Sequence, residues 1–279
     1  MVIVPAIYPE VFEEIVDKLY VLSGVSKLAQ IVICDGSYGL RVSWSPLGKE
    51  ILPDVFNYEF DLILTDWKTY LPRAYQLGVK RVVIHIDEFT EEDYEELFRA
   101  IHYYEMVLGI TVSNDISVDV LVNALKKIES SEYFDGISKV FVQVSGVRNL
   151  SEKEHPFDER AVARIRILKK MFPSLTVQVS GRINPETAWL VKDAGADRMV
   201  VGSYIFGHED LQEALRILKE AMEQERLAIK PEVKKVVKEP VKPEVKKPKE
   251  TKEERLKREA YEASKEEIVY GTDDDFFTK

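Results

Sequence analysis

Short apolar segments alternate with longer amphipathic segments along the first 226 or so residues of the chain. Each apolar segment is four to seven residues long and has few polar positions, which is typical of strands buried on both faces of a parallel sheet. The predicted strands are residues 2–6, 30–34, 60–64, 81–86, 106–112, 139–144, 176–179 and 198–201. Eight strand signals therefore precede the point at which the pattern stops.

The amphipathic segments predict helices, because their apolar residues recur every three to four positions. The predicted helices are residues 9–22, 66–77, 90–103, 117–128, 158–171, a helix that begins after Asn184, and residues 210–227. Two of them have clear start signals. Thr90 is an N-cap residue with Asp93 three positions later, and Asn184 precedes Pro185, which favours the first helical position.

Strands that alternate with helices predict a parallel sheet, and eight such units favour its closure into a (β/α)8 TIM barrel. We assign this barrel to residues 1–228, which is close to the length that such barrels need. An open doubly wound sheet is the alternative. It is less favoured because no glycine-rich dinucleotide-binding turn follows the first strand.

The pattern ends near Ala228. Residues 229–249 are rich in lysine, proline and glutamate, and from Lys230 onward valine is their only apolar residue. Such a segment cannot bury enough apolar surface to offset the entropy of ordering, so we predict a disordered linker. Residues 250–279 form a charged, helix-permissive tail whose end, from Tyr270 to Phe277, joins acidic and aromatic residues. This end is either a docking peptide for a protein partner or a solvated tail.

Charge and cysteine content narrow the class of protein. The net charge is −10, and the barrel segment is acidic while the linker is basic, which excludes a barrel that binds a specific nucleic acid. The single Cys34 lies in an apolar strand, so we expect a buried thiol and no internal disulfide. No apolar run approaches the roughly 18 residues of a membrane span, and no basic leader precedes the apolar N-terminus. We therefore expect a cytoplasmic protein without a membrane partner.

Glycine-bearing turns follow the last two predicted strands. The strand 176–179 leads into Gly181-Arg182, and the strand 198–201 ends in Gly202-Ser203. Backbone N–H groups of two such neighbouring turns can converge on one anion, as they do in many TIM barrels. We therefore predict a phosphate site at Gly181, Arg182, Gly202 and Ser203, with Gly146 after the sixth strand as a third donor. The alternative is that these glycines serve only the turns.

The order of motifs around these turns resembles the ribulose-phosphate 3-epimerase family of ribulose-phosphate-binding barrels. The likeness runs from Gly181 through Asn184-Pro185-Glu186-Thr187 and Ala194-Gly195-Ala196-Asp197 to Gly202-Ser203-Tyr204-Ile205-Phe206. Cys34-Asp35-Gly36 and Ile84-His85-Ile86-Asp87 occupy further positions of the family pattern. The likeness covers residues 1 to about 222. It implies a TIM barrel whose ligand is a phosphorylated sugar or a similar small anion.

The same resemblance places the family's catalytic metal site on altered residues. The epimerases hold a divalent metal on two histidines and two aspartates, and the aspartates act as acid and base. In this chain these positions are Gln30, Val32, Asp61 and Ser180. The resemblance thus implies that the metal and catalytic positions are not retained, and we expect neither a metal nor another cofactor.

Two aspartates remain as candidate catalytic residues. Asp35 and Asp61 lie on or just after predicted strands, toward the C-terminal face that carries function in TIM barrels. Asp35 precedes Gly36, so it is also a candidate for capping that turn. His85 lies on an apolar strand, where histidine is more often a hydrogen-bonded core residue than a catalyst.

Two functions are consistent with these residues. The first is an epimerase-like barrel of carbohydrate metabolism that binds a sugar phosphate and has a diverged isomerase or lyase activity, or none. The second is a non-catalytic pseudoenzyme scaffold whose C-terminal tail recruits a protein partner. The sequence leaves both turnover and homo-oligomerisation open.

The first prediction concerns the linker. Limited proteolysis should cut first within residues 230–249 and leave a core that ends near Leu227, because this segment has no apolar cluster that could pack. Mass spectrometry of the early fragments, with thermal unfolding of a chain truncated at Ala228, measures this. A linker that resists protease, or a truncated chain that unfolds, would show that the tail belongs to the fold.

Overall fold

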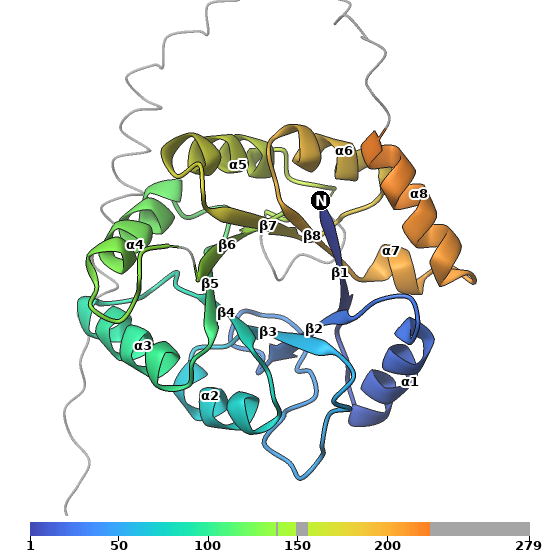
Figure 1. The fold of residues 1–279 in the computed structure, drawn as a ribbon, viewed down its shortest axis with the longest axis horizontal. Coiled ribbons are helices and arrows are strands. Elements are labelled where there is room, and N and C mark those ends of the chain that lie inside the picture. The colour runs from blue at the N-terminus through green and yellow to red at the C-terminus, as the bar shows by residue number, and fades with distance from the viewer. Residues whose placement is uncertain (138, 149–155, 224–279) are drawn as a thin grey trace, which may run out of the picture. The chain divides into compact units, whose positions relative to one another are not determined.

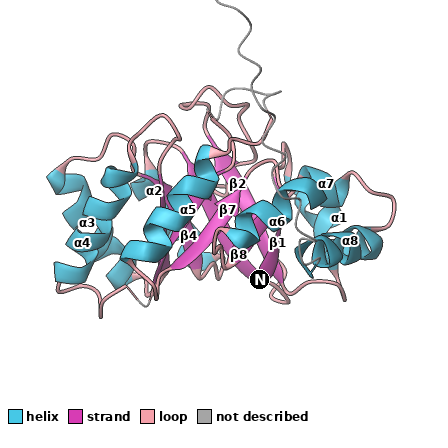
Figure 2. Cartoon of the chain, turned by 90° about the horizontal axis from the view of Figure 1, so that it is seen from above, coloured by secondary structure: helices cyan, strands magenta, loops and turns pink. Residues whose placement is uncertain are grey.

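The computed structural model describes residues 1–137, 139–148 and 156–223. Within these residues, eight parallel strands form a closed barrel in sequence order, and β8 pairs with β1. Figure 1 shows the helices in a ring around the strands, and Figure 2 shows the strands enclosed by helices at right angles to that view. The predicted TIM barrel is confirmed. The linker and the tail predicted for residues 229–249 and 250–279 lie outside the described residues.

The strands are β1 Val2–Ile7, β2 Leu28–Cys34, β3 Asn57–Ile63, β4 Arg81–His85, β5 Val107–Thr111, β6 Val140–Ser145, β7 Thr176–Ser180 and β8 Arg198–Val201. The helices are α1 Phe12–Leu22, α2 Trp67–Gln76, α3 Glu91–Tyr103, α4 Val118–Ser130, α5 Arg160–Met171, α6 Pro185–Asp193, the short α7 Ser203–Phe206, and α8 Leu211–Glu223. None of these helices is long and apolar enough to cross a membrane.

The predicted start signals of α3 and α6 are confirmed. The Thr90 hydroxyl accepts the N–H of Asp93, and the Asp93 carboxylate accepts the N–H of Thr90, so the two residues form a capping box. Asn184 forms the same reciprocal pair with Thr187, and Pro185 is the first helical residue. Each cap satisfies backbone groups that have no partner inside the helix. These two helices begin directly after the loops that follow β4 and β7, so the caps hold those loops in place.

The connection between β2 and β3 differs from the other connections, since residues 35–56 contain no helix. In Figure 1 this loop occupies the space between α1 and α2. The loop is nevertheless packed, because Trp44 is 7% exposed and its ring lies 5.5 Å from that of Phe12. The N–H of Trp44 donates to the carbonyl oxygen of Pro9, which lies before α1 rather than inside it as the apolar spacing predicted. The loop therefore takes the place of a helix over β2 and β3.

Strand side chains that point away from the barrel axis form the main core together with the helices. Ile31, Phe60, Ile84 and Val177 have no exposed surface. Continuous burial of this kind explains why each strand has a nearly unbroken apolar pattern. The pattern also placed two strand starts too late, because β2 begins at Leu28 and β3 at Asn57 rather than at residues 30 and 60. Glu59 is a charged residue inside the strand, and its burial could not be expected from its type.

Side chains that point toward the barrel axis are polar over much of its length. The polar column consists of Gln30, Glu59, Asp61, Gln143 and Gln178, each at most 3% exposed. The Nε2 atoms of Gln30 and Gln178 both donate to Glu59 Oε1, at 2.8 and 2.6 Å, and to Gln143 Oε1, at 3.0 and 2.9 Å. These bonds join β2 and β3 to β6 and β7 through the inside of the barrel. Many TIM barrels fill the same space with branched apolar side chains.

Two arginines neutralise Glu59 at the N-terminal end of the barrel. Arg81 Nε and Arg198 Nη2 each lie 2.8 Å from Glu59 Oε2, and the Glu59 side chain is 2% exposed. Both guanidinium groups also lie over the ring of Phe141, at 4.2 and 5.7 Å from its centroid. Gly109 leaves room for that ring, because a Cβ at this position would overlap with it. Ion pairs and one aromatic ring therefore fill the N-terminal end of the barrel.

The second prediction tests the buried carboxylate. Glu59→Gln keeps the size of the side chain but leaves two guanidinium groups without a counter-charge, so we expect the free energy of unfolding to fall by about 3–5 kcal/mol. Urea denaturation followed by circular dichroism measures it. The matched control is Asp193→Asn, which removes an exposed carboxylate from an ion pair with Arg166 and should cost less than about 1 kcal/mol. Equal losses in the two variants would contradict this account of the interior.

Candidate functional site

A histidine and an aspartate form a buried pair near the C-terminal ends of β3 and β4. His85 Nε2 lies 3.1 Å from Asp61 Oδ1, and each side chain is 4% exposed. The Nε2 of Gln143 donates to the second oxygen of Asp61 at 2.8 Å. Asp61 is thus the uppermost member of the polar column, and both of its carboxylate oxygens accept hydrogen bonds inside the barrel.

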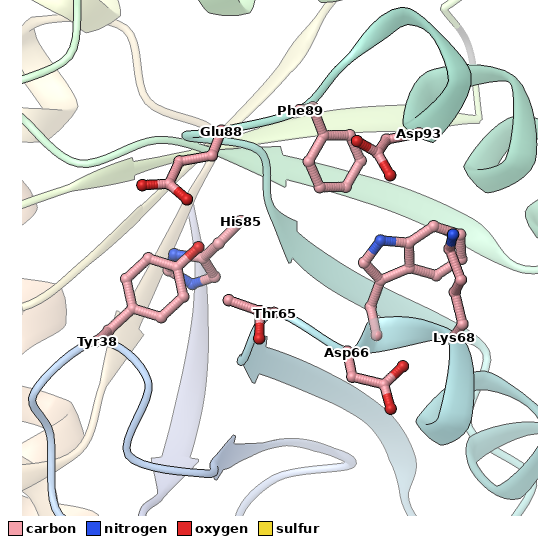
Figure 3. Close-up of a pocket in the computed structure, with 9 residues that line it drawn as sticks. Tyr38, Thr65, Asp66, Lys68, His85, Glu88, Phe89 and Asp93 are labelled. Atoms are coloured by element: carbon pink, nitrogen blue, oxygen red, sulfur yellow. The ribbon is translucent and has the colours of Figure 1, made fainter. Parts of the chain in front are cut away.

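This arrangement assigns the tautomer of His85. Because a carboxylate oxygen accepts from Nε2, that nitrogen carries the proton in the neutral ring. The other ring nitrogen, Nδ1, is buried and has no hydrogen-bond partner among the described residues. Its lone pair is therefore free. The ring of Tyr38, from the β2–β3 loop, lies 5.3 Å from the imidazole and partly covers it (Figure 3).

A cavity of about 350 Å³ opens beside this pair. Its lining comes from the loops after β2, β3 and β4, and comprises Tyr38, Thr65, Asp66, Trp67, Lys68, His85, Glu88, Phe89 and Asp93 (Figure 3). The rings of Trp67 and Phe89 are stacked with their centroids 6.3 Å apart. The carboxylates of Asp66 and Asp93 cap α2 and α3, whereas that of Glu88 is exposed. The cavity therefore combines aromatic faces with hydrogen-bond acceptors.

The structure separates the two predicted aspartates. Asp61 is buried in the barrel. Asp35 is exposed, and its Oδ1 accepts the N–H of Ser37 at 2.9 Å, which is the turn-capping arrangement. Asp35 lines neither of the two cavities that contain Tyr38. The geometry therefore connects Asp61, and not Asp35, to His85.

Cys34 and Tyr8 lie beside each other near the same end of the barrel. The thiol of Cys34 is free and 2% exposed, which confirms the expectation of a buried cysteine. Burial raises the pKa of this thiol, and burial together with the neighbouring thiol raises the pKa of Tyr8 to about 12. The Tyr8 hydroxyl donates to the carbonyl oxygen of Arg41. Both groups therefore stay protonated near neutral pH.

The turn after β7 has an unusual backbone. Gly181 has φ +100°, and Arg182 has φ +57°, in the left-handed region that side chains other than glycine seldom adopt. The resemblance to the epimerase family places a second glycine at position 182. Arg182 thus keeps the backbone shape of glycine while it adds a guanidinium group.

The turns after β7 and β8 open into one cavity. This cavity, of about 740 Å³, is lined by Arg182, Asn184 and Thr187 from one side and by Ser203 and Tyr204 from the other. Phe157, Ile183, Leu190, Pro156, Glu159 and Glu186 complete the lining. The structure therefore brings together the two segments that the sequence assigned to phosphate binding.

Gly202 and Gly146 are both required for close packing of the backbone. A Cβ at Gly202 would come within 2.9 Å of the carbonyl oxygen of Ala6, and a Cβ at Gly146 would overlap with the carbonyl oxygen of Gly181. The N–H of Gly146 donates to the carbonyl oxygen of Ser180 at 2.6 Å. Gly146 therefore brings the β6 and β7 turns together, while its own N–H is already engaged.

The resemblance to the epimerase family places the family's metal ligands at Gln30, Val32, Asp61 and Ser180. The Nε2 of Gln30 donates to Glu59 and Gln143, so this side chain belongs to the polar column. Val32 has no donor atom, and Asp61 accepts from His85 and Gln143. In the described parts of the chain, no three histidine, cysteine, aspartate or glutamate side chains are grouped so that they could hold a metal ion.

The sequence analysis missed the polar column. A signal was present, because Gln30, Glu59, Gln143 and Gln178 are polar residues within otherwise apolar strands. Each has strand neighbours that face the helices, so the period of two places all four at the barrel axis. That interpretation requires the strand boundaries and the closed barrel, which the sequence alone supplied only approximately.

The fold and the polar groups at the C-terminal ends of its strands define a TIM barrel, and the cavities beside His85 and Arg182 lie on the face where such barrels carry their sites. A sequence model described as "Ribulose-phosphate 3 epimerase family" matches residues 47–206. The chain belongs to this family.

Among curated relatives, the ribulose-phosphate 3-epimerase of Aquifex aeolicus is 30% identical over 58% of this chain and 68% of its own length. The ribulose-phosphate 3-epimerase of Methanocaldococcus jannaschii is 31% identical over 55% of this chain and 67% of its own length. A solved 3-hexulose-6-phosphate synthase covers 79% of this chain and 98% of its own, with a TM-score of 0.53 and 15% identity. Orotidine 5'-monophosphate decarboxylase from Sulfolobus solfataricus covers 79% and 97%, with a TM-score of 0.51 and 15% identity. At this identity, the two structures show a common fold alone.

Proposed function

We propose that the protein binds a phosphorylated sugar, and that its centre does not perform the metal-dependent epimerisation for which its relatives are named. The observation that carries the first part is the cavity lined by Arg182 and Ser203, which belong to the turns after β7 and β8. Backbone N–H groups in turns at neighbouring strand ends favour an anion there. The guanidinium group of Arg182 lines the same cavity and can bind a phosphate through two parallel hydrogen bonds.

The carboxylates in this cavity favour a ligand that also carries hydroxyl groups. Glu159 and Glu186 line it together with Arg182. A bare phosphate would meet repulsion from both carboxylates, whereas sugar hydroxyls can donate hydrogen bonds to them. This combination supports a sugar phosphate over inorganic phosphate as the preferred ligand.

The second part of the proposal follows from the family's metal positions. A divalent metal needs several oxygen, nitrogen or sulfur donors that are free to turn toward it. Val32 has none, and the Gln30 side chain is committed to the polar column. Only Asp61 is a strong ligand, and both of its oxygens are hydrogen-bonded. The donor set therefore does not fit the metal. A scaffold without turnover, which acts through its tail, remains the competing proposal.

The third prediction tests the anion site. D-ribulose 5-phosphate and other pentose phosphates should raise the thermal stability of the protein, by about 2.7 kcal/mol at 100 times the dissociation constant. Differential scanning fluorimetry measures the shift against inorganic phosphate and against the unphosphorylated sugars. Gly202→Asp should abolish it, because its Cβ would lie 2.9 Å from the carbonyl oxygen of Ala6 and its carboxylate would repel the phosphate. The melting temperature of this variant without ligand is measured in parallel, to show that it is folded. Arg216→Gln, which removes an exposed arginine on α8, is the control that should leave it unchanged. No shift with any phosphate ester, or a full shift in Gly202→Asp, would refute the site.

The fourth prediction concerns the metal. Protein purified without chelators should contain no stoichiometric zinc, iron or manganese, and it should not epimerise D-ribulose 5-phosphate in a coupled assay, even with added divalent metal. The physical reason is the loss of ligands at Gln30, Val32 and Ser180. Elemental analysis and the assay decide it, with an active epimerase as the positive control. Stoichiometric metal together with turnover would show that other residues supply the site.

A further inference from the structure

His85 is a buried base whose proton-accepting atom has no partner. Its Nε2–H is held by Asp61, its Nδ1 is unpaired among the described residues, and the residue lines the cavity of about 350 Å³ beside Tyr38 and Thr65. A buried polar atom without a partner costs free energy, so it is seldom left without a role. We propose that His85 Nδ1 is the proton acceptor of a metal-free reaction centre that interconverts aldose and ketose phosphates. This inference rests on the proposed function, and it names the reaction at the same face of the barrel.

The polar column positions the imidazole. Asp61 accepts from Nε2 and in turn accepts from Gln143, whose Oε1 is held by Gln30 and Gln178. Both glutamines also donate to Glu59, which the two arginines neutralise. The carboxylate of Asp61 therefore has little freedom to rotate, and the ring stays in the tautomer whose Nδ1 accepts a proton. Asp61 and Gln143 are positioning residues, and His85 is the catalytic residue.

The number of available bases selects the reaction. Epimerisation inverts a carbon, so it needs one group on each face of the substrate to remove and return a proton. Ser180 occupies the position of the family's second aspartate, and a serine hydroxyl does not accept a proton near neutral pH. Raised pKa values keep Cys34 and Tyr8 protonated as well. Of the carboxylates that line the cavity, those of Asp66 and Asp93 cap helices and that of Glu88 is exposed. His85 is then the one buried base of the lining, and a single base acts on one face only.

One base on one face suffices for aldose–ketose isomerisation. Nδ1 takes a proton from the hydroxyl-bearing carbon beside the carbonyl group, and the electron pair of that C–H bond forms the enediol. The imidazolium then returns the proton to the neighbouring carbon, while the hydroxyl proton moves from one substrate oxygen to the other. No oxidant, reductant or leaving group is required. Tyr38 lines the cavity, and burial raises its pKa, so its hydroxyl stays protonated and can donate to the carbonyl oxygen.

The cavity suits the carbon chain of a small sugar. Its volume of about 350 Å³ lies at the lower end of the range for small-molecule sites. The rings of Trp67 and Phe89 offer apolar faces for C–H groups, and Thr65 and Glu88 offer partners for hydroxyls. The strands β3 and β4 lie across the barrel from β7 and β8, where the phosphate is proposed to bind.

The first experiment reads the tautomer directly. The chain has four histidines, so the imidazole ¹⁵N resonances of the full-length protein can be assigned with single His→Gln variants. We expect the neutral ring of His85 to carry its proton on Nε2, with an unprotonated Nδ1. In Asp61→Asn, whose amide can donate to Nε2, the proton should move to Nδ1. A wild-type ring that is protonated on Nδ1, or on both nitrogens, overturns the inference, and this result does not depend on phosphate binding.

The fifth prediction, which is the second experiment, detects proton removal. In D₂O, the protein should exchange the C1 hydrogen of D-ribulose 5-phosphate or D-fructose 6-phosphate for deuterium and release the aldose, as followed by ¹H NMR. His85→Gln should slow this exchange at least about 100-fold, the usual minimum contribution of a general base. His102→Gln, which changes an exposed histidine bonded to the Tyr133 carbonyl oxygen, is the matched control and should keep the wild-type rate.

The outcomes separate this inference from the proposed function. Exchange at C1 that depends on His85 supports both. A thermal shift with sugar phosphates but no exchange refutes the role of His85 and leaves the binding proposal intact. The same conclusion follows if His85→Gln is as stable to heat as the wild type and exchanges the C1 hydrogen at the wild-type rate. Exchange at C3 would indicate the two-base epimerase reaction and also refutes it. No thermal shift and no exchange with any sugar phosphate counts against both proposals.

Discussion

The carboxylate of Glu59 lies at the axis of the barrel, out of contact with water, and the interior is arranged around the need to stabilise its charge. Four donors reach it, two from the guanidinium groups of Arg81 and Arg198 and two from the amides of Gln30 and Gln178. A buried carboxylate without such partners would cost several kcal/mol and would be protonated instead. The ion pairs fill the N-terminal end of the barrel. The two glutamine amides connect Glu59 to the side chains nearer the C-terminal end.

This hydrogen-bond network also holds the side chains at the C-terminal end of the barrel. The glutamines that stabilise Glu59 also hold Gln143, and Gln143 holds the carboxylate of Asp61. Because Gln143 holds one carboxylate oxygen of Asp61, the other oxygen faces His85 and selects one tautomer of its ring. The residue that stands at a family metal position, Gln30, is thereby part of the support for an imidazole. In the proposed scheme, a hydrogen-bonded column replaces the metal as the element that organises the centre.

The cavity beside His85 and the cavity beside Arg182 differ in the side chains that line them. The loops after β2 to β4 contribute aromatic rings and carboxylates, among them Trp67, Phe89 and Glu88. The cavity at the turns after β7 and β8 is lined by Arg182 and Ser203, with Glu159 and Glu186 beside them. A ligand with an anionic end and a hydroxylated end is the kind of molecule that such a distribution can orient. The β2–β3 loop, which contains no helix, contributes to the cavity beside His85 because it places the ring of Tyr38 over that histidine.

The sequence by itself determined the fold and the position of the turns that are proposed to bind a phosphate. Apolar strands of four to seven residues alternate with capped amphipathic helices, and these are local patterns that the chain satisfies within a few neighbours. Glycines at positions 181 and 202 mark turns in the same local way. The resemblance that pointed to the epimerase family also depended on motifs of contiguous residues.

Only the tertiary structure decided the function of the polar residues inside the strands. Glu59, Gln143 and Gln178 come from three strands, and the hydrogen bonds among them span up to 119 positions of the chain. Asp35 and Asp61 looked equivalent in the sequence, yet one caps a turn in solvent and the other orients a buried histidine. The difference arises because a side chain's chemistry depends on its burial and its partners, and closure of the barrel is what brings those partners together.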